Sequence, residues 1–154
     1  MKKIILTLLT LLLVLHIGAQ ETHSVGSNAN FRTYRFDNEF FLILSFKDDD
    51  ENRLMEESTV KFLLSDGNVI KLEGTNGSKR IKTSKGFWSD YESKETHYAL
   101  FYITQEQIEM LKVGVEKVAI NTIPEVYKRD SWAGKGSFGQ KLHKEFKAMK
   151  DEFE

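Results

Sequence analysis

Residues 60–72 read VKFLLSDGNVIKL, and no other stretch says as much about the fold. Apolar side chains stand at every second position from Val60 to Leu64, which places them on one face of a strand. Asp66-Gly67 follows, and a tight turn needs the positive φ angles that Asp tolerates and Gly adopts freely. The apolar residues after the turn are expected to return antiparallel to the first strand. The stretch therefore predicts a β-hairpin.

Strand patterns continue on both sides of this hairpin. Residues 40–46 read FFLILSF, an almost continuous apolar run that predicts a central strand buried on both faces. Residues 96–103 alternate, with His97, Ala99, Phe101 and Ile103 expected on one face. Further strands are predicted at 31–36, which reads FRTYRF, and at 115–120, before the only proline of the chain, Pro124.

A short helix is predicted at about 104–113. Thr104 and Gln107 have the spacing of a capping box, in which each side chain accepts a hydrogen bond from the backbone N–H of the other residue. Gly114 is a natural C-terminal stop. Because the helix has few turns, tertiary packing is expected to hold it.

A second, amphipathic helix is predicted at about 138–153. Its apolar residues recur at spacings of 4, 4, 3 and 4, which puts them on one stripe: Phe138, Leu142, Phe146, Met149 and Phe153. We expect this stripe to pack on one face of the sheet; a helix that docks on a partner protein is the alternative. With no internal repeat and no Pro-rich, Gly-rich or Ser-rich linker, residues 31–154 are predicted to form one α+β domain with a mostly antiparallel β-sheet.

The N-terminus has the pattern of an export signal. Lys2 and Lys3 precede an apolar run over 4–17, and the small residues Gly18 and Ala19 close it. The run is shorter than the roughly 20 residues of a membrane-spanning helix, although an uncleaved anchor is the alternative. We predict a signal peptide over 1–19, with cleavage after Ala19 or one residue later, and a flexible leader over 20–30.

Export constrains the mature chain. A short Lys-Lys start is typical of bacteria, so the periplasm or the medium is the expected location. The chain has no cysteine, which excludes disulfides and a cysteine-linked lipid anchor, and no membrane span is expected after cleavage. Of 22 basic residues Lys2 and Lys3 leave, so 20 remain against 23 acidic residues, a net charge of −3. Nucleic-acid binding is not expected, because it depends on a basic surface.

Loop aromatics are the best sequence clue to recognition. Phe87, Trp88 and Tyr91 cluster in a long polar excursion, and Trp132 lies in another loop. Such rings stack on sugars or anchor a protein partner. The alternative is that they pin the loops to the body of the domain.

Two weaker motifs resemble binding sites, one for an anionic ligand and one for calcium. Residues 134–139 match G-x-G-x-x-G, but only 15 residues follow Gly139, so the second strand and acidic residue of a dinucleotide site are not expected. A minor anion site at Lys135, Gly136 and Ser137 is the remaining possibility. Residues 48–59 begin like a calcium loop, with oxygen ligands at Asp48, Asp50 and Asn52, but positions 6 and 12 are Arg53 and Thr59.

No catalytic motif is present. His23, His97 and His143 show no metal-ligand spacing, and neither a G-x-S-x-G elbow nor a cysteine nucleophile occurs. We therefore expect no catalytic residues, no cofactor and no bound metal. The leading hypothesis is a non-catalytic, exported binding or accessory domain whose partner is a cell-envelope protein or a glycan. The alternatives are a small hydrolase with an Asp/Glu/His site assembled by the fold and a purely structural domain.

Overall fold

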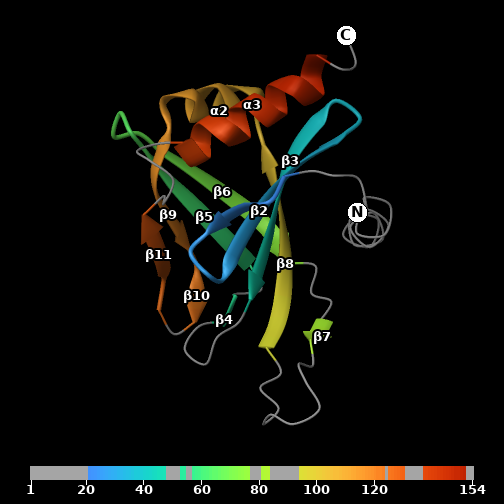
Figure 1. Ribbon diagram of the computed structural model, residues 1–154, viewed down its shortest axis with the longest axis vertical. Coiled ribbons are helices and arrows are strands. Elements are labelled where there is room, and N and C mark those ends of the chain that lie inside the picture. Colours follow the sequence, from blue (N-terminus) through green and yellow to red (C-terminus); the bar gives the residue numbers. More distant parts are fainter. Residues whose placement is uncertain are drawn as a thin grey trace.

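The computed structural model describes residues 21–47, 53–54, 57–76, 81–83, 94–123, 125–130 and 137–151. These residues form a mostly antiparallel β-structure with two short α-helices, as predicted (Figure 1). The strands are β1 (His23–Val25), β2 (Ala29–Phe36), β3 (Glu39–Lys47), β4 (Arg53–Leu54), β5 (Glu57–Leu64), β6 (Val69–Asn76), β7 (Ile81–Thr83), β8 (Lys94–Ile103), β9 (Val115–Ile120), β10 (Thr122–Ile123) and β11 (Tyr127–Asp130). The helical segments are α2 (Gln105–Met110), the 3-10 turn η1 (Leu111–Val113) and α3 (Ser137–Asp151).

The main sheet has the order β1-β2-β3-β8-β6-β5-β9-β11, and every described pairing in it is antiparallel. Strand β7 adds to β8, and β4 pairs with β10 in a separate small sheet. The main sheet curves into a nearly closed, barrel-like shape, with α2 and α3 across one end (Figure 1). Strand order does not follow chain order, because β8 lies between β3 and β6.

Side chains link the two ends of this strand order. The Tyr127 hydroxyl on β11 donates a buried hydrogen bond to the Val25 carbonyl on β1, 3.0 Å away. The same ring meets Phe46 of β3 edge-on, with centroids 5.2 Å apart. The interior is filled with apolar side chains, and its largest fully buried members are Phe31, Phe46, Phe62, Phe101 and Phe146. The barrel therefore has a packed core.

The predicted hairpin is confirmed. Strands β5 and β6 pair from Glu57 with Thr75 to Leu63 with Val69. In the turn, Gly67 has φ +87°, and the Asp66 carboxylate accepts a hydrogen bond from the Asn68 N–H at 3.0 Å. The local chemistry of the Asp-Gly pair was enough to locate this turn.

The prediction that 40–46 is buried on both faces is wrong. Strand β3 alternates: Phe40, Leu42, Leu44 and Phe46 are buried, whereas the residues between them are only half-buried. A barrel-like sheet has one inner face to bury, and the apolar residues on the other face of β3 pack sideways along the surface. The ring of Phe41, for example, meets that of Tyr102 on β8 at 5.9 Å.

The flexible leader predicted at 20–30 is also wrong for the described part of that segment, 21–30. Residues 23–25 form β1, which folds back on β2 with Val25 opposite Ala29. Val25 and Ala29 are 1% and 0% exposed, and both belong to the core. The residues around them are small and polar. The strand has only three residues, too few for its alternation to be recognised in the sequence.

The first helix begins and ends at the residues that the sequence predicts. Thr104 and Gln107 form the predicted capping box, and Gly114 ends the segment with φ +98°. The last turn is the 3-10 segment η1, which is common at helix ends. The C-terminal helix is present too, and it buries Phe138, Leu142 and Phe146.

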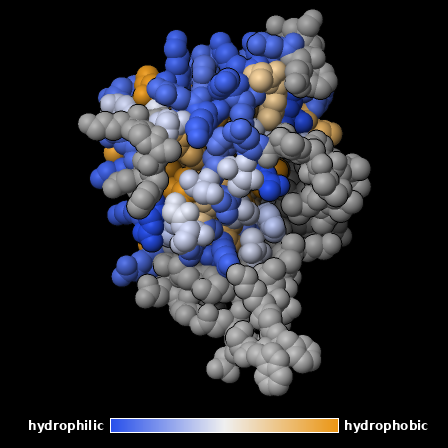
Figure 2. All heavy atoms as spheres, in the orientation of Figure 1, coloured by the Kyte–Doolittle hydropathy of each residue, from blue (hydrophilic) through white to orange (hydrophobic). Residues whose placement is uncertain are grey.

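The surface over α2 and α3 is largely hydrophilic (Figure 2). No helix within the described ranges has both the length and the hydropathy to cross a membrane.

Candidate functional site

A groove of about 500 Å³ lies on the outer surface of the barrel, over β5, β9, β11 and the start of β6. Strands β9 and β11 are on the left in Figure 1. The groove is lined by apolar and basic residues: Lys61, Leu63, Val69, Lys117, Val118, Ala119, Lys128 and Arg129. It is open to solvent and rich in positive charge, although the mature chain is expected to be acidic overall.

The strand register explains why lysines surround this groove. Lys61 on β5 pairs with Ala119 on β9, and Ala119 pairs in turn with Lys128 on β11. Paired residues of adjacent strands point to the same face, so the three side chains form one outward row. The methyl group of Ala119 leaves a hollow between two long cationic side chains. In the next row, Leu63 pairs with Lys117 and Val69.

The ammonium groups of Lys61 and Lys128 have no ion-pair partner among the described side chains. By contrast, Lys71 on β6, one strand away from Lys61, contacts the Glu73 carboxylate at 2.6 Å. This contact lowers the pKa of Glu73 below its ordinary value, first through the hydrogen bond from Lys71 and then through its charge. The groove thus holds two exposed lysines that are available to an anionic ligand.

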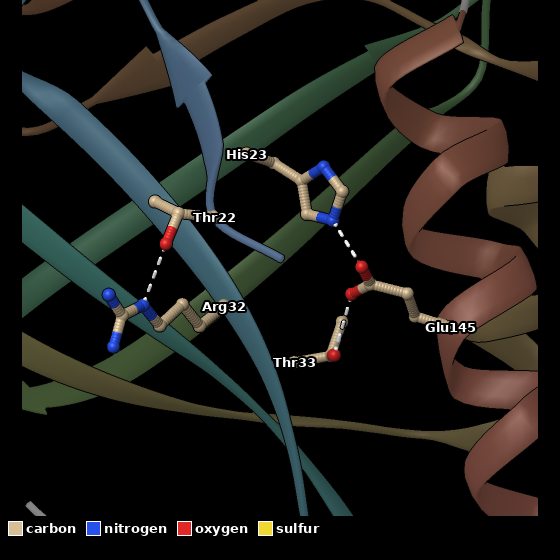
Figure 3. A network of polar contacts seen from close by, with 5 residues as sticks. All are labelled: Thr22, His23, Arg32, Thr33 and Glu145. Carbon is tan, nitrogen blue, oxygen red and sulfur yellow. Dashed lines mark hydrogen bonds and ion pairs between the residues drawn. The ribbon is translucent and has the colours of Figure 1, made fainter. Parts of the chain in front are cut away.

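A second polar cluster joins the N-terminal strand to the last helix (Figure 3). His23 Nε2 on β1 lies 2.7 Å from Glu145 Oε1 on α3. The Thr33 hydroxyl on β2 donates to the other carboxylate oxygen, Oε2, at 2.8 Å. Nearby, Arg32 Nε donates to the Thr22 hydroxyl at 2.9 Å.

Burial argues against acid–base catalysis by this cluster. Only 5% of the His23 side chain is exposed, against 22% for Glu145. The imidazole also meets the ring of Phe138 edge-on, with centroids 6.4 Å apart. A general base must reach a proton of the substrate, and this imidazole is enclosed by the protein.

A third cluster connects α2 to α3. His143 Nε2 lies 3.4 Å from Glu109 Oε2, and Lys147 Nζ lies 3.8 Å from Glu109 Oε1. The pKa of Glu109 is lowered from its ordinary value, chiefly by the hydrogen bond from His143. Desolvation opposes this effect, and the positive charge of Lys147 supports it.

No protein-family model, curated protein or solved structure matches this chain. Its function therefore has to be inferred from its own residues, above all from the groove and from the expected export signal.

Most site residues predicted from the sequence lie outside the described residues. This holds for the aromatic residues Phe87, Trp88, Tyr91 and Trp132, for Lys135 and Gly136, and for the calcium candidates Asp48, Asp50 and Asn52. Ser137 is described, and it is the first residue of α3. These predictions stay predictions.

Neither the groove nor the contact between His23 and Glu145 was predicted from the sequence. Strand alternation does place Lys61 and Lys117 on the outside, but nothing in the sequence shows that β5, β9 and β11 are neighbours. Likewise, His23 and Glu145 are separated by 122 positions. Their contact depends on β1 joining the sheet, which the sequence had not predicted.

Proposed function

We propose that the chain is exported from a bacterial cell and that its mature form is a non-catalytic binding protein of the cell envelope. The basic start at Lys2 and Lys3, the apolar run over 4–17 and the small residues at the exit support export. The enclosed position of His23 supports a role without catalysis.

The ligand we propose is an acidic glycan, and the groove is the observation that carries this proposal. Lys61 and Lys128 stand on either side of Ala119. Adjacent strands are about 4.8 Å apart, so the backbones beneath the two lysines are about 10 Å apart. That spacing suits a single sugar chain, with carboxylate or phosphate groups toward the lysines. The apolar surface of Leu63, Val69 and Ala119 would meet the less polar faces of the sugar rings.

Within this proposal α3 covers its own domain and does not bind the partner. Phe138 meets the rings of Phe31 and Phe62 at 5.6 and 5.9 Å, and Phe146 meets that of Phe40 at 5.8 Å. Such contacts favour packing of the amphipathic stripe on one face of the sheet. The surface left for a ligand is then the strand face that carries the groove.

Binding to alginate, a carboxylate-rich polysaccharide, tests the proposal, with neutral dextran as the reference. Replacing both Lys61 and Lys128 by Glu should weaken alginate binding about tenfold or more, because attraction becomes repulsion at two contacts. Replacing Lys112 and Lys144 by Glu changes the net charge equally at exposed positions away from the groove, and binding should persist. Isothermal titration at low and high salt measures both, and salt should weaken the binding.

Equal affinity in the two double variants would contradict the groove, and equal affinity for alginate and dextran would contradict an anionic ligand. The aromatic residues predicted from the sequence are tested in the same assay by Trp88→Ala. If this variant loses binding while the Lys61/Lys128 variant keeps it, the ligand binds at the aromatic loop and not at the groove.

A further inference from the structure

Three metal-ligating side chains converge beside the first strand: Glu21 before it, His23 on it and Glu145 on α3. Donor atoms of Glu21, His23 and Glu145 all lie within 4.8 Å of one another. Glu21 is exposed, directly before β1, whereas His23 is buried and Glu145 is partly covered. We propose that these three residues bind one Zn²⁺ ion, which fastens the first strand to the last helix.

The two inner donors are already oriented for this role. The Thr33 hydroxyl holds Glu145 Oε2 at 2.8 Å, which leaves Oε1 directed at the imidazole of His23 (Figure 3). Phe138 packs against the edge of that imidazole and limits its rotation. Partners that orient a ligating carboxylate or imidazole are a regular feature of metal sites. Glu21, on the exposed side, is free to swing in as the third ligand.

Small movements would convert the cluster into a site. Zn²⁺ binds imidazole nitrogen and carboxylate oxygen at about 2.0–2.2 Å, so ligands of a tetrahedral site lie about 3.3 Å apart. His23 and Glu145, now 2.7 Å apart, would separate slightly as the ion replaces the proton between them. His23 binds the ion as a neutral imidazole through Nε2, and its ring proton is then carried on Nδ1. Glu21 would move inward from the exposed side, and water on that side, away from the buried imidazole, would occupy the fourth position.

The donor set selects the ion. One nitrogen and two carboxylates suit Zn²⁺, whereas Ca²⁺ and Mg²⁺ prefer sites made of oxygen alone. Either cleavage position predicted for the signal, after residue 19 or after residue 20, leaves Glu21 in the mature chain. The site does not depend on the proposed glycan groove, which lies on other strands.

Zn²⁺ titration of the exported protein, stripped of metal with EDTA, tests the proposal by calorimetry and thermal unfolding. We expect one ion per chain, a Tm that rises with Zn²⁺, and no comparable rise with Ca²⁺. Glu21→Gln is the decisive variant, because an exposed side chain can be changed without unfolding the domain. It should lower Zn²⁺ affinity at least tenfold and leave the metal-free Tm unchanged. Co²⁺ should show the visible absorption of a tetrahedral site.

His143→Gln is the matched control, because it removes the other His–Glu pair of the described residues, His143 with Glu109. Zn²⁺ binding should survive in this variant and be lost in His23→Gln. The proposal fails if Zn²⁺ produces neither heat nor a Tm shift, if Glu21→Gln binds as tightly as the parent, or if His143→Gln abolishes binding. A Ca²⁺ shift as large as that of Zn²⁺ would also overturn it.

Discussion

Tyr127 links the two ends of the nearly closed barrel, and Gly26 leaves space for its hydroxyl. The Tyr127 hydroxyl reaches the Val25 carbonyl across the gap between β1 and β11. Gly26 follows Val25 with φ +69°, and a Cβ added there would overlap that hydroxyl. The Arg129 side chain also lies over the Tyr127 ring, 4.5 Å from its centroid. Gly26 therefore permits both the left-handed backbone after β1 and the close approach of Tyr127 on β11.

Replacing Gly26 by Ala should destabilise the protein by about 2–5 kcal/mol. The left-handed backbone accounts for about 1–2 kcal/mol of this, and the overlap with Tyr127 adds a packing cost of about 1–3 kcal/mol. Gly67→Ala is the matched control, since Gly67 has φ +87° but open space around it. It should lose only the backbone part, about 1–2 kcal/mol. Urea unfolding measures both, and equal losses would show that the approach of Tyr127 does not constrain residue 26.

At the level of elements, α3 is held by contacts at each end and along its length. Phe138 packs in the core near its start, and Arg35 on β2 donates to the Met149 carbonyl near its end at 2.6 Å. A cation at this position satisfies a free carbonyl and complements the negative end of the helix dipole. In the middle, Glu145 contacts β1 and β2, and His143 contacts α2.

The contact between α2 and α3 should depend on pH through Glu109. Its folded pKa lies below the ordinary 4.5, so the folded state favours the ionised carboxylate. The stabilisation is present above the unfolded pKa and is lost as the pH falls through the folded value. His143→Leu removes the largest cause, because leucine has no donor, so the pKa of Glu109 should rise toward 4.5 in an NMR titration of its carboxyl carbon.

Lys144→Gln is the control for that titration, because Lys144 is an exposed neighbour on the same helix. It should leave the pKa of Glu109 low. If the pKa is the same in His143→Leu as in the parent, the hydrogen bond from His143 is not what lowers it.

For the whole molecule, the predicted export signal ends directly before the first strand. Strand β1 begins at His23, so cleavage after residue 19 or 20 would leave only two or three residues before the first strand. Val25 is part of the core, and cleavage further along the chain would remove a strand from the sheet. The start of the fold thus limits how far downstream the signal peptidase could cut.

We predict that the chain expressed with its own first 19 residues is recovered from the periplasm or the medium, with Gln20 or Glu21 as its first residue. A charge in the apolar middle should block export, so Leu12→Arg should leave the chain in the cytosol. Intact mass spectrometry of the cytosolic, membrane, periplasmic and medium fractions measures where each chain is found and which residue is its first. An intact Met1 on membrane-bound protein would favour the uncleaved anchor, and an intact Met1 on cytosolic protein would contradict export altogether.

Local signals in the sequence determined the hairpin turn at Asp66-Gly67, the cap at Thr104 and the stop at Gly114. Each depends on the φ preferences or hydrogen bonds of residues only a few positions apart, so a short window contains all of its causes. Alternation likewise determined the inner face of β8, where Ala99, Phe101 and Ile103 are buried.

Only the tertiary structure decided the strand order, the recruitment of β1, the row of Lys61, Ala119 and Lys128, and the meeting of His23 with Glu145. These depend on which distant segments pair, and alternation shows which way a side chain points but not what lies beside it. The 122 positions between His23 and Glu145 are bridged because α3 lies against β1 and β2, and many strand orders would satisfy the same local patterns.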